Sequence, residues 1–434
     1  MRITVPGDKS LTQRALILSA LADGESRLSG LLYGGDAEST AGALRALGAR
    51  IPAIPADGSE IRIHGVGLRG LSKPGDVLDL GNSGTGTRLL MGVLAGSHVT
   101  ATLDGDRSLR SRPMARVTKP LAAMGARFEH GGEVDRLPIT VHGRHPLEPV
   151  DWPSPVASAQ VKSSILLAGL TGGAFAMITE PRRSRDHTER LFQSVGAAVV
   201  CHESEGGWRV ELRDPPARID PLDFAVPGDV SSAAFLLAFA ALGGVGDELT
   251  IEDVGLNPTR TAFIEVLRRM GAAVEVVMGS SPAAAEPVGA VTIRPSTLRG
   301  VTVGGEEVPR LIDELPLIAA MGACADGTTR ITGAEELRAK ESDRIVAMVA
   351  NLRALGVEVE ELPDGMVVEG AGRPLEGTAR SWDDHRIAMS LLVLGALPGN
   401  RIDVSGSEAS RVSFPGFREQ LQRISGRHVR GRET

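Results

Sequence analysis

The sequence of 434 residues contains only two cysteines, Cys201 and Cys324. Two cysteines cannot form the disulfide framework of a small secreted domain, and neither lies at a metal-site spacing from histidine. The start, MRITVPGDKS, also lacks the charged, apolar and small-residue pattern of a secretory signal. We therefore expect a cytoplasmic protein with neither disulfides nor a bound metal.

Long uncharged segments and an excess of positive charge are also absent. The longest uncharged runs, residues 163–179 and 230–246, are shorter than the roughly 20 residues of a membrane-spanning helix and predict buried core helices. The formal net charge of -7 argues against a nucleic-acid-binding surface, which normally carries a basic excess. Clusters of positive charge are therefore expected to be local and functional. A domain size of about 150 residues predicts two or three domains.

An amphipathic helical pattern that ends in glycine recurs along the chain. Its six copies are marked by turn glycines that lie 77, 71, 75, 85 and 70 residues apart: Gly48, Gly125, Gly196, Gly271, Gly356 and Gly426. A glycine after the last apolar turn supplies a left-handed C-cap, and the Val, Ile or Phe residues that follow favour a strand. Two helix starts carry capping signals, since residues 186–189 have capping-box spacing and Asn257 precedes a first-turn proline.

A second, more apolar helical pattern alternates with the first and also occurs six times. Its copies are RALILSALADG, TRLLMGVLAG, SSILLAGLTGG, SSAAFLLAFAALGG, LPLIAAMGACADG and IAMSLLVLGALPG. Each repeat therefore contains one buried helix, one more exposed helix and several strands. A proline-rich segment, residues 213–229, divides the six repeats into three and three. Residues 279–289 predict a flexible loop, and the tail after Arg427 is expected to be disordered.

The six apolar helices begin with polar and charged residues. The sets are Lys9, Ser10 and Arg14; Asn82, Ser83, Thr85 and Arg88; Ser158, Gln160 and Lys162; Asp229, Ser231 and Ser232; Asp313 and Glu314; and Asp384, His385 and Arg386. Free N–H groups at helix N-termini attract anions, and basic or hydroxyl side chains strengthen such sites. Ordinary N-capping explains any one set taken alone. Because unpaired cations are unfavourable in apolar surroundings, their recurrence favours a shared anionic ligand or buried carboxylate partners.

A second group of charged residues lies in the segments DRSLRSRPM, RRSRDHTER and RAKESDR. They supply Arg107, Arg110, Arg112, Arg182, Arg183, Arg185, Lys340, Glu341 and Arg344. A solvated surface explains Arg182 and Arg183 at least as well as a ligand does, and residues 340–344 also fit a capped helix start with local ion pairs. The segment LGNSGTGTR is similar to a phosphate-binding glycine loop but lacks the lysine that ends a P-loop.

These segments together resemble one known family. In chain order between residues 6 and 390 they are PGDKSLTQR, LGNSGTGTR, RSRPM, SAQVKSSILLAG, SRDHTE, GDVSSAAFLLAFAAL, NPTR, IDELPLIA, AKESDRI and DDHRIAMS. The sequence resembles the 5-enolpyruvylshikimate-3-phosphate synthases, the enolpyruvyl transferases of the shikimate pathway. The resemblance implies an α/β fold of two globular domains, each an inside-out α/β barrel of three βαβαββ repeats with pseudo-threefold symmetry. It places one domain at residues 9–227 and the other at 1–8 with 228–434, with the active-site cleft between them.

The resemblance also implies a reaction and a set of site residues. The enolpyruvyl group of phosphoenolpyruvate is transferred to the 5-hydroxyl of shikimate 3-phosphate with release of phosphate, by a monomer that needs no cofactor, metal, nucleic acid or membrane. Shikimate 3-phosphate would be bound by Lys9, Ser10, Arg14, Ser158, Ala159, Gln160, Arg185, Asp313 and Lys340. Phosphoenolpyruvate would be bound by Lys9, Gly84, Arg112, Gln160, Arg344 and Arg386. Because the methylene carbon gains a proton and the hydroxyl loses one, an acid and a base are required, and the candidates are Lys9, Asp313 and Glu341.

One position departs from the family pattern, and two alternative functions stay open. Many relatives have lysine two residues before the Phe-Pro pair where this chain has Val412, and the adjacent Arg411 is a candidate substitute. The sister enolpyruvyl transferase that acts on UDP-N-acetylglucosamine generally uses a loop cysteine as proton donor, but residues 104–113 contain none. A non-catalytic anion-binding protein of the same fold is the other alternative. Phosphate release that requires both substrates would exclude it.

Overall fold

The structure of the protein is a computed structural model, and it describes residues 1–280 and 286–433. The described chain divides into two compact units. The N-terminal unit comprises Gly7–Val226 together with Glu286. The C-terminal unit comprises Met1–Pro6, residues 227–280 and residues 287–433. Each unit has its own hydrophobic core, so the chain contains two separately packed bodies.

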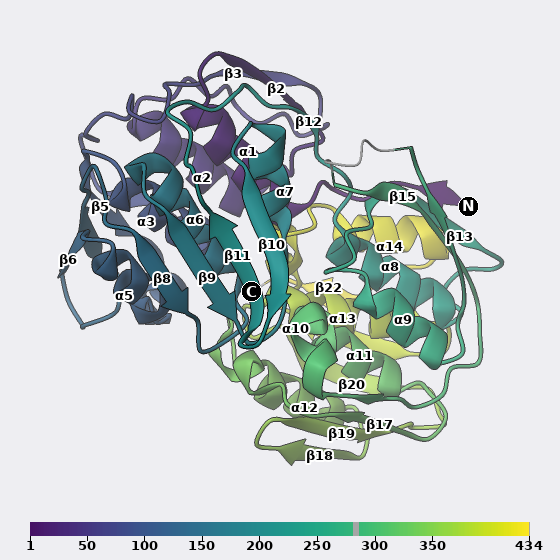
Figure 1. The fold of residues 1–434 in the computed structure, drawn as a ribbon. Helices are drawn as coiled ribbons and strands as arrows, with labels where there is room; N and C mark the ends of the chain where they lie inside the picture. The colour runs from purple at the N-terminus through teal and green to yellow at the C-terminus, as the bar shows by residue number, and fades with distance from the viewer. Residues whose placement is uncertain (281–285, 434) are drawn as a thin grey trace. The chain divides into compact units, whose positions relative to one another are not determined.

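The N-terminal unit, coloured purple to teal, places three apolar helices inside three sheets (Figure 1). Nearly every side chain of these helices is buried: α1 (Lys9–Leu21), α3 (Gly84–Ala95) and α6 (Ala159–Gly172). The first sheet contains β12 (Asp223–Ala225), β2 (Glu25–Ser29) and β3 (Ile61–His64). The second contains β4 (Leu78–Asp79), β5 (Thr100–Asp104), β7 (Ile139–His142) and β6 (Arg127–His130). The third contains β10 (Val199–Ser204), β11 (Gly207–Leu212), β9 (Ala176–Glu180) and β8 (Val150–Pro153).

The C-terminal unit repeats this arrangement. Its buried helices are α8 (Val230–Ala241), α11 (Leu315–Gly322) and α13 (His385–Ala396). One sheet contains β1 (Arg2–Ile3), β13 (Leu249–Gly255), β15 (Val288–Arg294) and β14 (Ala273–Met278). The next contains β16 (Thr302–Val303), β17 (Thr328–Ile331), β19 (Gly365–Glu369) and β18 (Val359–Leu362). The last contains β20 (Glu376–Arg380), β21 (Arg401–Ser405) and β22 (Gly431–Arg432).

The predicted amphipathic helices are confirmed. They are α2 (Gly35–Ala46), α5 (Ala115–Ala123), α7 (His187–Ser194), α9 (Ala262–Arg269), α12 (Arg344–Ala354) and α14 (Phe417–Ser425). All six turn glycines have positive φ, between 64° and 101°, which residues with a side chain rarely adopt. Shorter helical turns are α4 (Arg107–Ser111), α10 (Val308–Leu311) and the 3-10 segments Gly305–Glu307, Glu335–Ala339 and Ser407–Val412.

Each four-stranded sheet combines one parallel pair with antiparallel pairs. In the second sheet, β4 and β5 are parallel across α3, whereas β5, β7 and β6 pair antiparallel, with Leu103 opposite Ile139. Strands β5 and β7 alternate buried and partly exposed residues, so one face of the sheet covers the helices. The expected α/β fold is confirmed, and four of the six sheets in the described chain have the four strands of a βαβαββ repeat, whereas the first and the last have three.

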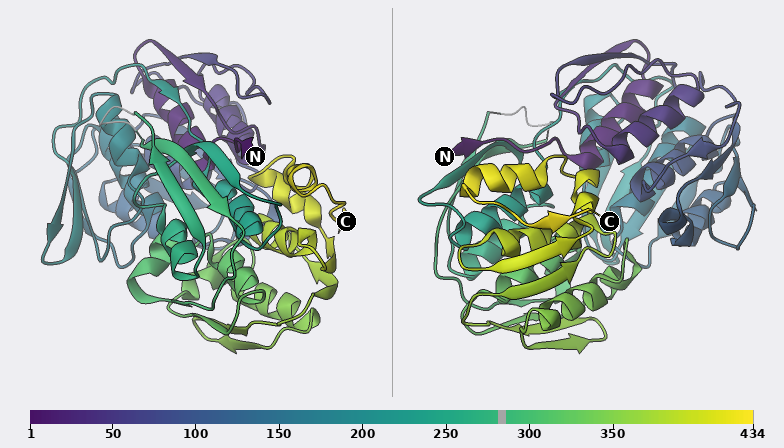
Figure 2. Two further views of the ribbon diagram at one scale, coloured as in Figure 1. Left: turned by 90° about the vertical axis from the view of Figure 1, so that its right-hand side faces the viewer. Right: turned by 180° about the vertical axis from the view of Figure 1, so that it is seen from behind.

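Four local expectations are corrected or limited by the structure. Residues 186–189 form no capping box, since Asp186 accepts from Arg183 and Arg190 instead. Asn257 caps the turn before α9 by accepting from the Thr259 N–H, and the helix itself begins at Ala262. Residues 428–433 of the tail are ordered, because β22 within them pairs with β21 (Figure 2). Of the loop expected at 279–289, residues 281–285 lie outside the described residues, and residues 288 and 289 belong to β15.

Candidate functional site

The N-terminal turns of the three buried helices in the N-terminal unit meet through side-chain hydrogen bonds. Gln13 Nε2 on α1 donates to Ser83 Oγ, the N-cap of α3, at 2.5 Å. Arg14 Nη2 donates to Ser163 Oγ on α6 at 2.9 Å. Arg88 on α3 completes the set by donating to Gln160 on α6 at 2.7 Å. The helix starts that the sequence marked as candidate anion sites therefore lie together in this unit.

Lys9 begins α1, directly after the N-cap Asp8. Its Nζ lies 3.1 Å from a carboxylate oxygen of Asp36 on α2, and 16% of its side chain stays exposed. Asp36 was not identified from the sequence, because it lies 27 residues from Lys9 in an otherwise ordinary helix start. The lysine charge is thus held by one partner while part of the side chain stays open to a ligand.

Arg14 is a buried cation whose hydrogen-bond partners are neutral. Its guanidinium donates to Thr188 Oγ1 at 2.8 Å, to Ser163 Oγ at 2.9 Å and to the Ser10 carbonyl at 3.1 Å. Burial lowers the pKa of Arg14 to about 10, and the nearby carboxylates of Glu189 and Asp8 oppose that shift only in part. A bound anion would offset the remaining charge, because such a charge-assisted contact is roughly twice as strong as a neutral one.

Gly84 lies where two guanidinium groups approach the start of α3. A Cβ added to Gly84 would lie 2.9 Å from Arg112 Nη1 and 3.2 Å from Arg88 Nη1. Arg112 Nη2 also donates to Asn82 Oδ1 at 2.5 Å. The missing side chain therefore leaves room beside two cations and a helix N-terminus, a combination that favours a phosphate or carboxylate.

The start of α6 carries three of the predicted ligands. Ser158 is the N-cap, but its hydroxyl makes no capping hydrogen bond, and its N–H donates to Glu180 at 2.9 Å. Gln160 accepts from Arg88 and donates to Thr85 Oγ1 at 2.9 Å. Ala159, Ser10 and Arg185 are partly buried in the same unit. The predicted residues of the N-terminal unit therefore lie at or next to its helix starts.

In the C-terminal unit, Arg344 is enclosed by carboxylates. Its Nε lies 2.8 Å from Asp384, its Nη2 lies 2.7 Å from Glu341 and its Nη1 lies 3.4 Å from Asp313. Burial acts against the charge, but the carboxylates outweigh burial, with Asp384 the largest contribution, and raise the pKa of Arg344. Asp384 also caps α13 by accepting from the Arg386 N–H. The guanidinium therefore orients the two candidate acid–base residues, and a ligand anion would have to replace one of these contacts.

We expect Arg344→Gln to lower the free energy of unfolding by about 3–5 kcal/mol, because it leaves buried Asp384 without its cation. Chemical denaturation measures this loss. The matched control is Arg338→Gln, whose partners Asp343 and Glu361 lie nearer the surface at 2.9 Å each. Arg338→Gln should lower the free energy of unfolding by about 1 kcal/mol or less. Equal small losses in both variants would show that the Arg344 cluster is not a buried ion network.

Arg386 differs from Arg344, since it lies on an aromatic ring. Its guanidinium carbon is 5.7 Å from the centre of the Phe235 ring, and the residue is only 4% exposed. Within the described residues, its buried Nε and Nη1 have no hydrogen-bond partner. An unpartnered buried donor is unfavourable by about 1–3 kcal/mol, so this side chain is prepared to receive an anion.

Lys340 is the other predicted ligand of this unit. Burial lowers the pKa of Lys340, although Asp313 partly opposes the shift.

Several other sequence-based candidates have different surroundings. Arg183 pairs with Asp186 at 2.7 Å and lies 4.7 Å from the centre of the Trp208 ring, which fits the surface interpretation. Arg411 is largely exposed and pairs with Glu433 at 2.5 Å. Within the described ranges, no cluster of three His, Cys, Asp or Glu side chains could hold a metal ion.

The carboxylates that support the site were not identified from the sequence. Besides Asp36, these are Glu180 and Glu189, both buried around Lys162. A usable signal existed, because a lysine within an apolar helix requires a buried anionic partner. What the sequence could not indicate was which of the chain's 54 acidic residues supplies it.

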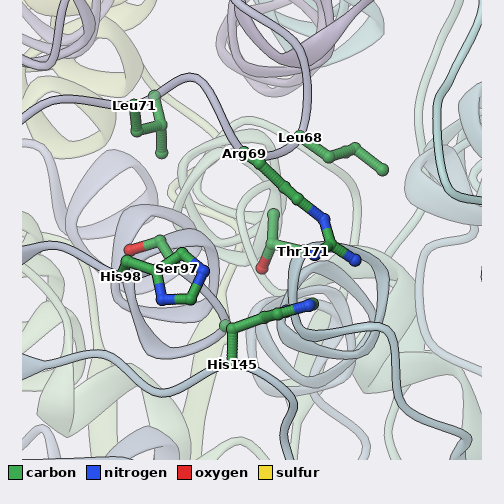
Figure 3. A pocket seen from close by; sticks show the side chains of 8 residues that line it. Leu68, Arg69, Leu71, Ser97, His98, His145 and Thr171 are labelled. Carbon is green, nitrogen blue, oxygen red and sulfur yellow. The ribbon is translucent and has the colours of Figure 1, made fainter.

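A small pocket lies at the opposite ends of α3 and α6 (Figure 3). Its lining includes Arg69, His98, His145 and Thr171. The two imidazole rings meet edge to face with centres 5.3 Å apart, and burial lowers the pKa of His145. None of the predicted substrate ligands lines this pocket, so it is separate from the helix starts described above.

Together these observations define a repeated α/β protein whose buried helices begin among cations. Residues 1–421 match the family model of EPSP synthase (3-phosphoshikimate 1-carboxyvinyltransferase). The 3-phosphoshikimate 1-carboxyvinyltransferase of Gloeobacter violaceus is 47% identical over 97% of this chain and 96% of its own, and that of Desulforamulus reducens is 46% identical over the same shares. A solved EPSP synthase from Acinetobacter baumannii superposes with a TM-score of 0.83 at 39% identity, covering 98% of this chain and 95% of that one. The chain belongs to the EPSP synthase family.

The family assignment confirms the resemblance seen in the sequence and the expected transferase class. The alternative of a UDP-N-acetylglucosamine enolpyruvyl transferase is not favoured, because the matching relatives are named 3-phosphoshikimate 1-carboxyvinyltransferase. In the parts of the chain that the structure covers, no helix combines the length and apolar character needed to cross a membrane.

Proposed function

We propose that the protein transfers the enolpyruvyl group of phosphoenolpyruvate to the 5-hydroxyl of shikimate 3-phosphate, releasing phosphate, in aromatic amino-acid biosynthesis. The observation that carries the proposal is the match, over nearly the whole chain, to relatives named 3-phosphoshikimate 1-carboxyvinyltransferase. The cation-rich helix starts support it, since each substrate brings a phosphate and a carboxylate. No cofactor is required by this chemistry.

In the proposed arrangement, shikimate 3-phosphate is bound from both units. The N-terminal unit contributes the starts of α1 and α6 with Arg185, and the C-terminal unit contributes Asp313 and Lys340. Phosphoenolpyruvate lies against Gly84, Arg112 and Gln160 of one unit and Arg344 and Arg386 of the other. Arginine suits this task because its planar fork matches carboxylate and phosphate oxygens in pairs.

The chemistry needs one proton delivered and another removed. Protonation of the phosphoenolpyruvate methylene makes C2 electrophilic, and the 5-hydroxyl attacks C2 as a base takes its proton. Collapse of the tetrahedral adduct then breaks the C2–phosphate oxygen bond and returns the methyl proton to a base. We assign the base roles in these two steps to Asp313 and Glu341, which both contact the Arg344 guanidinium, and the donor role to Lys9.

A coupled phosphate-release assay tests the proposed function. Release should require both shikimate 3-phosphate and phosphoenolpyruvate, and UDP-N-acetylglucosamine should not replace the first. Phosphate release with the UDP-sugar instead would assign the sister activity. Binding of both substrates without release would assign a non-catalytic anion-binding protein.

We further expect shikimate 3-phosphate to bring the two units together, because its proposed ligands belong to both. Cations from two units that bind one ligand would repel each other, and a bound phosphate and carboxylate would offset that repulsion and favour a closed state. Solution X-ray scattering should show a smaller radius of gyration at saturating shikimate 3-phosphate. Two ligands that favour one state must also strengthen each other's binding reciprocally. An unchanged radius of gyration at saturation would contradict the closure.

A further inference from the structure

Lys162 is a completely buried lysine that none of the predicted substrate contacts uses. It lies in the first turns of α6, where its Nζ is 2.7 Å from Glu189 and 3.1 Å from Glu180. All three side chains are buried, the lysine and Glu180 almost completely. Burial disfavours the lysine charge, but the two carboxylates outweigh burial and raise the pKa of Lys162. The group is therefore an internal ion cluster and not a surface for ligands.

Glu180 ends β9 and connects two ligand-bearing segments. One of its oxygens accepts from the Ser158 N–H at 2.9 Å, at the start of α6. Both oxygens lie 2.8 Å from Ser184 Oγ, and the Ser184 N–H points to one of them at 3.4 Å. Ser158 is itself a proposed ligand, and Ser184 directly precedes the proposed ligand Arg185. One carboxylate thus holds two backbone segments that come from different elements.

The third member of the cluster, Glu189, connects the cluster to another proposed ligand, Arg14. Glu189 is the largest carboxylate influence that keeps buried Arg14 charged. Arg14 also hydrogen-bonds Thr188 and Ser163, the sequence neighbours of Glu189 and Lys162. Burial raises the pKa of Glu189, and the Lys162 charge opposes that rise. Glu189 therefore connects Arg14 to the same buried cluster that surrounds Lys162.

Stability alone explains this cluster poorly. Replacing a buried ion network by apolar side chains is often neutral or stabilising, so a buried salt bridge is weak support for a purely structural role. Its hydrogen bonds also end at the segments that carry the proposed ligands and not at random core positions. The contacts indicate orientation of the site.

We propose that Glu180, held by Lys162, is a positioning residue for shikimate 3-phosphate. The inference rests on the proposed function, because Ser158, Gln160 and Arg185 are assigned as ligands only there. Glu180 does not touch the substrate. By accepting from the Ser158 N–H and the Ser184 hydroxyl, it orients the neighbouring hydroxyl, amide and guanidinium groups toward one anion.

The test is Glu180→Gln in the full-length protein, with steady-state kinetics for each substrate. The glutamine keeps an acceptor for the Ser158 N–H, but its amide nitrogen cannot accept from Ser184, and Lys162 loses one anionic partner. We expect KM for shikimate 3-phosphate to rise on the order of tenfold, because Ser158, Gln160 and Arg185 all bind it in the proposed arrangement. KM for phosphoenolpyruvate should rise less than threefold, because only Gln160 of these three also binds that substrate, and kcat should change less than threefold.

Two further variants make the result specific. Glu211→Gln changes another buried carboxylate of the same sheet, on β11, whose partner Arg213 lies 2.8 Å away and outside the ligand segments. This control should leave both KM values unchanged. Ser184→Ala removes only the hydroxyl that donates to Glu180, and this variant should raise KM for shikimate 3-phosphate about threefold. If Glu180→Gln does not fold, Ser184→Ala tests the positioning role instead.

The outcomes separate the two proposals. An inactive wild-type protein with both substrates would refute the proposed function. An active wild type, combined with unchanged KM for shikimate 3-phosphate in Glu180→Gln and Ser184→Ala, would overturn the positioning role alone. A parallel rise of both KM values with a loss of thermal stability would also overturn it, because that pattern describes general damage to the unit.

Discussion

Lys9→Met is expected to reduce turnover by about 10³-fold or more, within the range known for loss of a proton-transfer group. Lys9 is suited to this role because it begins α1 beside the other helix starts, keeps part of its side chain open and has a defined carboxylate partner. Methionine keeps most of the length of the side chain but removes the charge. Substrate-dependent phosphate release measures the loss.

The ion pair between Lys9 and Asp36 supplies the control. Lys9→Met leaves the mostly buried Asp36 carboxylate without its cation, so the single variant loses some stability as well. The double variant Lys9→Met with Asp36→Asn removes both charges and should recover that stability. Turnover should stay lost in the double variant. Activity that returned together with the melting temperature would show that Lys9 serves only the ion pair.

Asp313→Asn and Glu341→Gln are each expected to lower kcat by about 10² to 10⁴, in the range for loss of a general acid or base. KM for either substrate should change far less, because both substitutions preserve side-chain shape. Both carboxylates contact Arg344, at 3.4 Å and 2.7 Å, so they are oriented by one guanidinium. Single-turnover and steady-state kinetics separate the chemical step from binding.

Glu361→Gln is the matched control for these two variants. Glu361 lies in the same unit, but its cation at 2.9 Å is the partly exposed Arg338 instead of the buried Arg344. This variant should retain wild-type kcat. A near-normal kcat in Asp313→Asn or Glu341→Gln would remove that residue from the acid–base assignment and leave the other as the base.

Much of the architecture could be predicted because its signals are local. A left-handed turn after an amphipathic helix favours glycine, so Gly48 and its five counterparts mark the repeats in the sequence itself. Apolar runs of helical length mark the six buried helices, and N-cap chemistry marks three of their starts, at Ser83, Asp229 and Asp384. The predicted capping box at residues 186–189 was wrong, because the Asp186 side chain accepts from Arg183 and Arg190 instead of capping the helix.

By itself, the sequence determined the repeats, the helix starts with their cations and the resemblance to the family that the comparisons confirm. The tertiary structure alone decided which charges meet. Lys9 pairs with Asp36, Lys162 pairs with Glu180 and Glu189, and the Arg386 guanidinium lies over the Phe235 ring. Similarly polar helix starts thus became a partly exposed cation, a buried ion cluster and, within the described residues, a guanidinium with two unpartnered nitrogens. Helix starts follow from residues within one turn, whereas these contacts join residues up to 151 positions apart, and only the packing of the repeats brings such residues within a few ångströms.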